Sequence, residues 1–225
     1  MDFPTVTYED LETRIKEVGL GSSRLVKSAL FQAQSTHSTQ KRHNNAPYLE
    51  QHIYPVVSFV IEHELAIGRK VTPRIVAGAA VHDVLDDDIR MHLDMTIFHM
   101  FLDTVKLRIG EKTYRIVEPL WGIWYSKLPD RRERIIARLK RLEKAERESR
   151  IIALADKYDN LYCIDTLQNT LVQIPTHPYV IGKRKANQLV QEVREHYLPF
   201  AANYSPYFYR RMIERLDEIN LAMTR

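Results

Sequence analysis

The stretch Val81–Asp88 gathers side chains whose types and spacing could do chemistry. Its sequence, VHDVLDDD, sets a histidine beside an aspartate and follows them, within about one helical turn, with three more carboxylates. Four acids and one imidazole so close together repel one another unless a positive charge lies among them. The apolar run before them, Ile75–Val81, has the character of a buried helix, so we expect the acids at the inner end of a core element. Acids are tolerated there only when paired or bound to a metal, and this cost predicts a functional site.

Two residues elsewhere in the chain extend this stretch into a candidate metal-ligand set. Each lies in an apolar helical context, and the set comes from three predicted helices. The four candidate ligands are His52, His82, Asp83 and Asp156. Such a mixed shell of nitrogen and oxygen donors suits Mn²⁺, Fe²⁺ or Zn²⁺. A divalent ion held there would neutralise the acids and lower the pKa of a bound water, giving a nucleophile for phosphoester cleavage.

Single histidines in the same helices are weaker signals. A histidine such as His63 or His99 on an apolar helix face is more often a core or boundary residue with satisfied hydrogen bonds. A His-Asp pair also occurs by chance. The informative feature is the order of the candidate ligands, His, then His-Asp, then Asp, with every member predicted to lie on a helix.

The elements that must position these ligands are predicted to be helices, so the expected fold class is all-α. The chain has only seven glycines in 225 residues, and prolines and short polar side chains mark the helix starts. We expect Ser22 or Ser23 to cap the second helix, Thr72-Pro73 to begin the helix that carries the central stretch, and Pro129-Asp130 to begin a charged helix. Thr113–Val117 is locally strand-like. The main predicted helices cover about residues 25–40, 48–65, 73–88, 92–108, 130–148, 151–171, 183–197 and 206–223.

Composition and length limit the remaining function classes. We expect a single domain over residues 1–225, since a chain of this size can bury a sizeable core. The single cysteine, Cys163, excludes a disulfide framework and fits a reducing compartment. No apolar run approaches the ~20 residues needed to cross a bilayer, and the first residues lack a secretory leader. We therefore expect a cytoplasmic protein with no membrane partner.

The net charge of +4 and the pI of about 9.1 allow two interpretations. One is a nucleic-acid-binding surface, and the other is local clusters of base that grip an anionic small molecule. Acids are interleaved with the bases over most of the chain, so we expect an anionic small molecule as the ligand and no nucleic-acid partner. The Arg/Lys/Glu-rich outside of the helix over residues 130–148 is expected to be a solvated face.

Three motifs in order carry a resemblance to a known family. The segment HSTQKRHNNAPY, residues 37–48, resembles an H-x-x-Q-x-R-x-x-G-x-P-Y loop. HDVLDD, residues 82–87, resembles an H-D-x-x-E-D box, and LADKYDN, residues 154–160, resembles an L-A-D-x-x-x-N helix. Together they resemble the HD superfamily of metal-dependent phosphohydrolases, and within it the hydrolase domain of the Rel/Spo alarmone enzymes and the small alarmone hydrolases. The resemblance covers about residues 25–165, and residues 166–225 are expected to form a helical extension.

The resemblance implies an HD-domain helical bundle and a role for each site residue. It implies Mn²⁺ as the metal, with Fe²⁺ or Zn²⁺ as alternatives, held by the four ligands named above. Asp86 and Asp87 occupy the acidic pair that orients and activates the attacking water, since a carboxylate one turn after the ligands can accept its proton. Arg42 fits the residue that packs on the nucleobase, with His43 beside it in the substrate loop. Asn160 matches the residue that contacts the nucleoside.

Several positions depart from the family pattern. One more residue than usual separates Tyr48 from His52, and the segment between His52 and His82 is longer. Asparagine in place of the family glycine can still adopt positive φ. The substituted positions are His43 for a basic residue, Asn45 for glycine, Asp159 for histidine and Cys163 for threonine. The metal and water machinery is thus expected to be complete, while the nucleotide pocket is altered.

The leading hypothesis is therefore an alarmone hydrolase that removes the 3′-pyrophosphate from (p)ppGpp or (p)ppApp. An alternative is an HD-domain phosphatase or phosphodiesterase that acts on another nucleotide, such as a nucleoside monophosphate, NADPH or a cyclic dinucleotide. Outside enzymology, a catalytically inactive regulatory HD domain and a helical nucleic-acid-binding module are the competing interpretations. A homo-oligomer is left open, with the C-terminal helices either covering the core or forming its interface.

Overall fold

The computed structural model shows an all-α protein and describes residues 5–42, 46–85, 95–122, 128–164 and 183–223. Within these ranges no strand is present, and the predicted fold class is confirmed. No helix in them is long and apolar enough to span a membrane. The described α-helices are α1 (Tyr8–Glu17), α2 (Arg24–His37), α3 (Tyr54–Ala66), α4 (Pro73–Ala80), α6 (Met95–Ile109), α7 (Glu111–Val117), α8 (Arg131–Lys144), α9 (Arg147–Tyr162), α10 (Lys183–Glu192), α11 (Leu198–Tyr204) and α12 (Pro206–Met223).

Short polar side chains begin several of these helices, as the sequence predicts. Ser23 accepts a hydrogen bond from the backbone N–H of the third residue of α2, and Thr72 does the same for α4. Asp130 caps α8, and Thr7 forms a reciprocal capping box with the third residue of α1. These bonds satisfy N–H groups that have no partner inside the helix, so each fixes the residue at which the helix starts.

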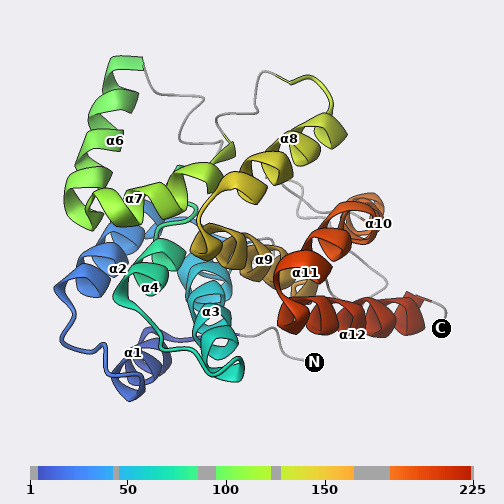
Figure 1. Cartoon of the computed structure of the whole chain (residues 1–225), viewed down its shortest axis with the longest axis horizontal. Helices are drawn as coiled ribbons and strands as arrows, with labels where there is room; N and C mark the ends of the chain where they lie inside the picture. Colours follow the sequence, from blue (N-terminus) through green and yellow to red (C-terminus); the bar gives the residue numbers. More distant parts are fainter. Residues whose placement is uncertain (1–4, 43–45, 86–94, 123–127, 165–182, 224–225) are drawn as a thin grey trace.

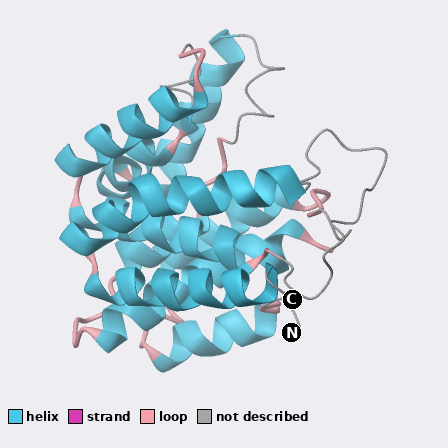
Figure 2. Cartoon of the chain, turned by 90° about the vertical axis from the view of Figure 1, so that its right-hand side faces the viewer, coloured by secondary structure: helices cyan, strands magenta, loops and turns pink. Residues whose placement is uncertain are grey.

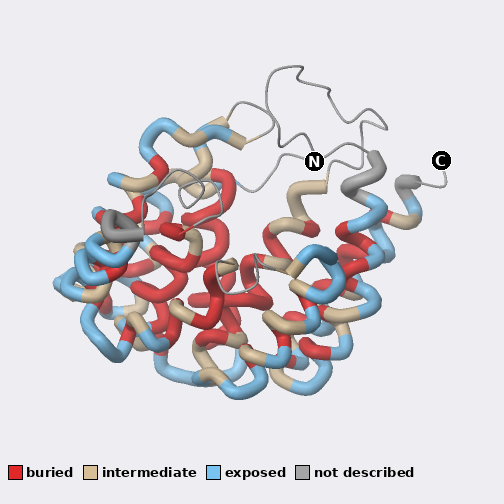
Figure 3. Tube along the Cα trace, turned by 90° about the horizontal axis from the view of Figure 1, so that it is seen from above, coloured by how far each residue is buried: buried red, intermediate tan, exposed pale blue. Residues whose placement is uncertain are grey.

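The centre of the fold is α4, which lies among α2, α3, α7 and α9 (Figure 1). Every residue from the third position of α4 to its end is buried. Gly78 allows the close approach of its neighbours, since a Cβ added there would lie 3.1 Å from Ile152 Cδ1 and 3.2 Å from Ile116 Cγ2. Seen from the side, most helices run across the molecule in stacked layers (Figure 2). Buried residues concentrate between these layers, and exposed ones lie on the outer faces (Figure 3).

The helix that was predicted to carry the central stretch ends before that stretch. α4 stops at Ala80, and residues 81–85 form turns, so the prediction that His82 and Asp83 lie on a helix is wrong. The reason is a local competition for backbone acceptors. His82 donates from its side-chain Nδ1 to the carbonyl oxygen of Ala79, 2.8 Å away, in the last turn of α4. A side chain that takes a terminal carbonyl in this way satisfies a helix end without extending it.

The strand-like segment Thr113–Val117 also differs from its local preference, because it lies in α7. Its buried residues are Thr113, Ile116 and Val117, which are spaced to fall on one face of a helix. β-propensity reflects fit to a pleated, half-buried surface and is overridden where a helical face can be buried instead. The helix α7 uses that face against α4 and α6.

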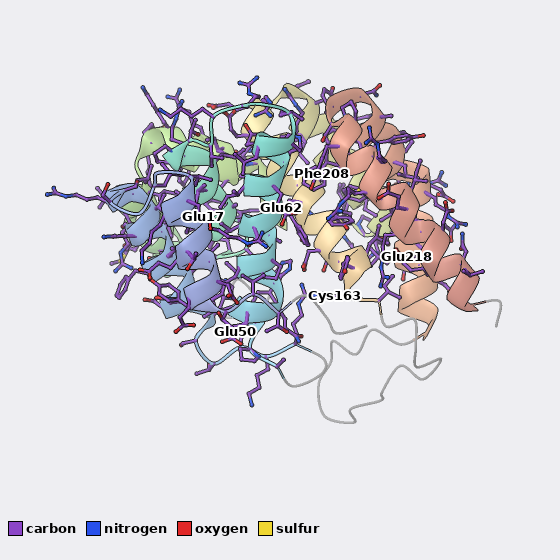
Figure 4. All side chains as sticks on the ribbon, turned by 90° about the horizontal axis from the view of Figure 1, so that it is seen from below. Glu17, Glu50, Glu62, Cys163, Phe208 and Glu218 are labelled. Carbon is purple, nitrogen blue, oxygen red and sulfur yellow. The ribbon has the colours of Figure 1, made fainter. Side chains whose placement is uncertain are left out.

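The C-terminal helices cover the core. Phe208 of α12 is fully buried and stacks on His63 of α3, with ring centroids 5.2 Å apart and planes 3° from parallel. Figure 4 shows Phe208 where α12 meets the inner helices. His63 is itself buried and lies 2.8 Å from a carboxylate oxygen of Glu64, which confirms it as a satisfied core histidine. The aromatic residues at the start of α12 therefore include a core residue.

Arg215 of α12 ties the extension to the end of α9. Its guanidinium donates to the backbone oxygen of Tyr162 at 3.0 Å and of Ile164 at 2.8 Å. These oxygens lie at the C-terminus of α9, where carbonyls lack intrahelical partners and where the helix dipole favours a cation. The C-terminal extension thus anchors the helix that carries Asp156.

Candidate metal centre

A π-helical turn accommodates the extra residue between Tyr48 and His52. Leu49–Ile53 is π-helical, and the N–H of Tyr54 bonds back to the oxygen of Leu49. Such a turn takes up one residue more than an α-turn, so an insertion can be absorbed while the helix after it keeps its direction. His52 therefore still lies against Tyr48, with ring centroids 5.0 Å apart.

His52 is buried and its two ring nitrogens face carboxylates. Nδ1 lies 2.6 Å from Asp159 Oδ2, while Nε2 lies 3.3 Å from Asp83 Oδ2 and 3.6 Å from Asp156 Oδ1. Burial and the nearby Arg42 lower the pKa of His52. Its hydrogen bonds to Asp159 and Asp83 outweigh them and raise that pKa to about 9. The carboxylates on its two sides therefore favour the protonated form of the ring.

His82 has one nitrogen fixed and the other available. Because Nδ1 donates to the Ala79 oxygen, the free lone pair of a neutral ring is on Nε2. Nε2 is buried and has no hydrogen-bond partner among the residues that the structure describes. Burial lowers the pKa of His82, so the neutral form is favoured. A buried neutral imidazole with one nitrogen held by a backbone carbonyl is the usual state of a metal-binding histidine.

Asp83 supplies an ionised oxygen beside the two histidines. Burial alone would raise its pKa, but the neighbouring His82 and the hydrogen bonds from His52 hold that pKa well below its usual range. The hydroxyl of Tyr48 also donates a short hydrogen bond to Asp83 Oδ2. The side chain of Asp83 stays 27% exposed, so this carboxylate lies at the open side of the group.

One donor atom each from His52, His82 and Asp83 lie within 4.8 Å of one another. Two nitrogens and a carboxylate oxygen at this spacing fit a divalent cation of the Mn²⁺, Fe²⁺ or Zn²⁺ kind. The fourth predicted ligand, Asp156, lies beside this group through its contact with His52, although it is outside the mutual 4.8 Å spacing. Asn160 holds it by donating from Nδ2 to Asp156 Oδ1 at 2.7 Å. The structure thus brings three of the four predicted ligands within mutual reach and places Asp156 beside them.

Arg42 turns inward. Its Nη2 lies 3.1 Å from Asp159 Oδ2 and 3.5 Å from Asn160 Oδ1, and its side chain is 9% exposed. The guanidinium also lies 5.6 Å from the centroid of the Tyr48 ring. The predicted packing of Arg42 on a nucleobase stays a prediction, because in this structure its charge is taken up by a protein carboxylate.

Three predicted site residues, His43, Asp86 and Asp87, lie outside the described residues, and their roles stay predictions. The structure also shows two polar contacts at the site that were not predicted from the sequence. These are the Tyr48 hydroxyl on Asp83 and the Asp159 carboxylate on His52. A signal for Asp159 was present, since it follows Asp156 by three residues and so shares a helix face with it.

Comparison with known proteins supports the fold. No protein-family model matches the chain, and no curated protein matches it. Among solved structures, it is similar to a metazoan ortholog of SpoT described as hydrolysing ppGpp and playing a role in starvation responses. The TM-score is 0.63 at 19% sequence identity, over 88% of this chain and 97% of that chain. The chain has the fold of this SpoT ortholog. The fold that the sequence resemblance implies is thereby confirmed.

Proposed function

We propose that the protein is a metal-dependent phosphohydrolase that removes the 3′-pyrophosphate from an alarmone nucleotide of the (p)ppGpp or (p)ppApp kind. The observation that carries the proposal is the hydrogen bonding of the two ring nitrogens of His82. Its Nδ1 is fixed by the Ala79 carbonyl, and its buried Nε2 has no hydrogen-bond partner among the described residues. That nitrogen belongs to a group with His52 and Asp83 whose spacing fits a divalent cation.

The residues that would hold the cation are His52, His82 and Asp83, joined by Asp156. A divalent ion in such a site supplies charge neutralisation, polarises a phosphoryl oxygen and lowers the pKa of a coordinated water. The other residues keep the ligands in place. Tyr48 holds Asp83 through its hydroxyl, and Asn160 holds Asp156 through its amide.

Positive charge around the ligands suits an anionic substrate. Arg138 of α8 lies 3.6 Å from Asp156 Oδ2, beside the metal group, whereas Arg42 is already paired with Asp159. Guanidinium groups bind phosphate oxygens well, because their planar donors match the spacing of those oxygens. In the proposed reaction, Asp86 and Asp87 keep their predicted role as the acidic pair that orients the water and accepts its proton.

The choice of substrate draws on the three sequence motifs together with the fold. The metazoan SpoT ortholog of the same fold is described as hydrolysing ppGpp. We transfer that substrate class to this chain as a proposal, since the metal-ligand order and the L-A-D-x-x-x-N motif are both present.

The test is an assay of pyrophosphate release by purified protein loaded with Mn²⁺. Wild-type protein should release pyrophosphate from at least one alarmone class. His82→Ala, which removes the free Nε2, should lower that rate by more than about a hundredfold. Wild-type protein that binds Mn²⁺ but releases no pyrophosphate from either class would rule the proposal out.

A second substrate class is favoured by the altered nucleotide pocket. Asp159 and Cys163 replace the histidine and threonine of the family pattern, and Asp159 holds the arginine that was expected to meet the base. A nucleoside monophosphate, NADPH or a cyclic dinucleotide could therefore be the substrate of the same site. Assaying these nucleotides for phosphate as well as pyrophosphate release separates the two possibilities.

A further inference from the structure

A buried carboxylate lies behind the metal group and has no role in the proposed reaction. Asp159 has no exposed surface, and its Oδ2 accepts from His52 Nδ1 at 2.6 Å and from Arg42 at 3.1 Å. Its other oxygen, Oδ1, has no hydrogen-bond partner among the residues that the structure describes. Burying such a group is costly unless it is paired, so its partners must account for its presence.

Two carboxylates of α9 contact opposite nitrogens of the His52 imidazole. Asp156 and Asp159 are three residues apart and therefore lie on the same helix face. Asp156 approaches Nε2 of the imidazole, on the side of the metal group, while Asp159 approaches Nδ1 on the opposite side. The imidazole of His52 is thus held between two carboxylates from consecutive turns of α9.

A carboxylate on the second nitrogen of a histidine has a defined effect on a metal at the first. It keeps the proton on Nδ1, directs the Nε2 lone pair to the metal, and makes the ring a stronger donor. Arg42 balances the charge of this carboxylate in its buried position. Asp83 cannot keep the proton on Nδ1 of His52, because it contacts the ring at Nε2.

We infer that Asp159 is a positioning residue that fixes His52 with Nε2 toward the metal group and thereby strengthens metal binding. The inference rests on the proposed function in one respect, namely that the group takes a divalent cation. It concerns this chain's own residue, because the family pattern that the sequence resembles often has histidine at this position. Asp159 contacts His52 at Nδ1, the ring nitrogen that faces away from Asp83 and Asp156, so it would act on the cation only through that ring.

The chain offers a matched control in Glu64. Its carboxylate also lies between a histidine and an arginine, 2.8 Å from His63 Nδ1 and 2.6 Å from Arg147 Nη2, and it is equally buried. Glu64 lies twelve residues beyond His52 along the same helical rod, which corresponds to roughly 18 Å. Glu64→Gln therefore removes the same charge from the same kind of arrangement at a distance from the metal group.

The experiment measures Mn²⁺ affinity by calorimetric titration of the wild-type chain, Asp159→Asn and Glu64→Gln. Asp159→Asn should bind Mn²⁺ about 10–100-fold more weakly, as expected when the partner of a metal-binding histidine is lost. Glu64→Gln should lower thermal stability and leave the Mn²⁺ affinity unchanged. Equal Mn²⁺ affinity of Asp159→Asn and wild type would overturn the inference, and so would an equal loss of affinity in Glu64→Gln.

A second measurement keeps Asp159 in place, so it does not depend on whether Asp159→Asn folds. In ¹⁵N-histidine-labelled wild-type protein loaded with diamagnetic Zn²⁺, the ring of His52 should be bound through Nε2 and carry its proton on Nδ1. His52→Gln assigns the signal. A proton on Nε2, or binding through Nδ1, would overturn the inference.

Failure of the inference and failure of the proposed function give different results. If wild-type protein binds Mn²⁺ more tightly than Asp159→Asn but releases no pyrophosphate, the proposed function fails and the role of Asp159 stands. If pyrophosphate is released while Asp159→Asn binds the metal as tightly as wild type, the reverse holds. Wild-type protein that binds no divalent metal contradicts both.

Discussion

The two histidines of the metal group are held by different kinds of acceptor. His82 donates from Nδ1 to the backbone oxygen of Ala79, and His52 donates from Nδ1 to the carboxylate of Asp159. The first contact could be predicted only once the end of α4 was known, because the sequence favoured a helix that continues through His82 to residue 88. The second could not, since which acid faces which histidine depends on how α9 packs against the helix that carries His52.

Replacing single acids should separate metal binding from turnover. Asp83→Ala should lose the metal, because it removes an ionised ligand from the group of three. Asp87→Ala should keep the metal and lower turnover by about 10²–10⁴-fold, as expected for loss of a general base. Metal content after desalting and the rate of pyrophosphate release measure the two effects. Equal metal loss in both variants would show that the two acids share one role.

The thiol of Cys163 should be unreactive at ordinary pH. Burial, followed by the nearby Asp159 carboxylate, raises the pKa of Cys163 to about 12. Because only the thiolate reacts with alkylating agents, the folded protein should be modified far more slowly at about pH 8 than a free thiol is. The rate should rise as pH rises toward that pKa. Iodoacetamide labelling followed by mass spectrometry checks this, with urea-unfolded protein as the control. Equally fast labelling of folded and unfolded chains would contradict it.

At the scale of elements, the sequence predicted most helix starts and fewer helix ends. Ser23, Thr72 and Asp130 cap the helices for which they were considered, because an N-cap is a local bond between near neighbours. The end of α4 and the π-helical turn at Leu49–Ile53 were not predicted. The end of α4 depends on the His82 side chain. The π-helical turn accompanies the contacts of His52 with Asp83 and Asp159, and no local sequence pattern shows these contacts.

The crossing of α4 with α7 and α9 should be sensitive to volume at Gly78. Gly78→Val should destabilise the protein by about 2–3 kcal/mol, because its branches would overlap Ile152 and Ile116 in a packed core. Gly78→Ala is the control. Alanine is favoured over glycine in a helix by about 1 kcal/mol, and this gain offsets the milder crowding of its Cβ against the flexible ends of neighbouring side chains. Urea unfolding measures both. A Gly78→Val variant as stable as Gly78→Ala would contradict this account of the crossing.

At the scale of the whole molecule, the C-terminal extension is part of what holds the site together. The all-α class followed from the few glycines and the helix-start residues, and the central role of residues 25–165 followed from three motifs in order. The contacts of α12 with α3 and α9 did not, because its buried residues Phe208 and Arg215 belong to no motif. The single domain over residues 1–225 stays a prediction.

Removing Arg215 should weaken the attachment of α12 to α9. Arg215→Ala leaves the backbone oxygens of Tyr162 and Ile164 without this donor. We expect a loss of about 2–3 kcal/mol, since buried charge-assisted bonds are lost, and a melting temperature lower by about 4–12 °C. Arg210→Ala, at an exposed position of the same helix, should change stability by no more than about 0.5 kcal/mol. Thermal unfolding measures both variants, and equal melting temperatures would contradict the anchoring role.

The group of His52, His82 and Asp83 is proposed to bind a divalent cation that serves removal of a 3′-pyrophosphate. The most direct measurement is ³¹P NMR of an alarmone incubated with the Mn²⁺-loaded protein, recorded after the paramagnetic metal is chelated. Inorganic pyrophosphate should appear while the 5′-phosphates of the nucleotide remain intact, and His82→Ala should abolish this change. An unchanged spectrum with metal-loaded wild-type protein, or equal turnover by His82→Ala, would contradict it.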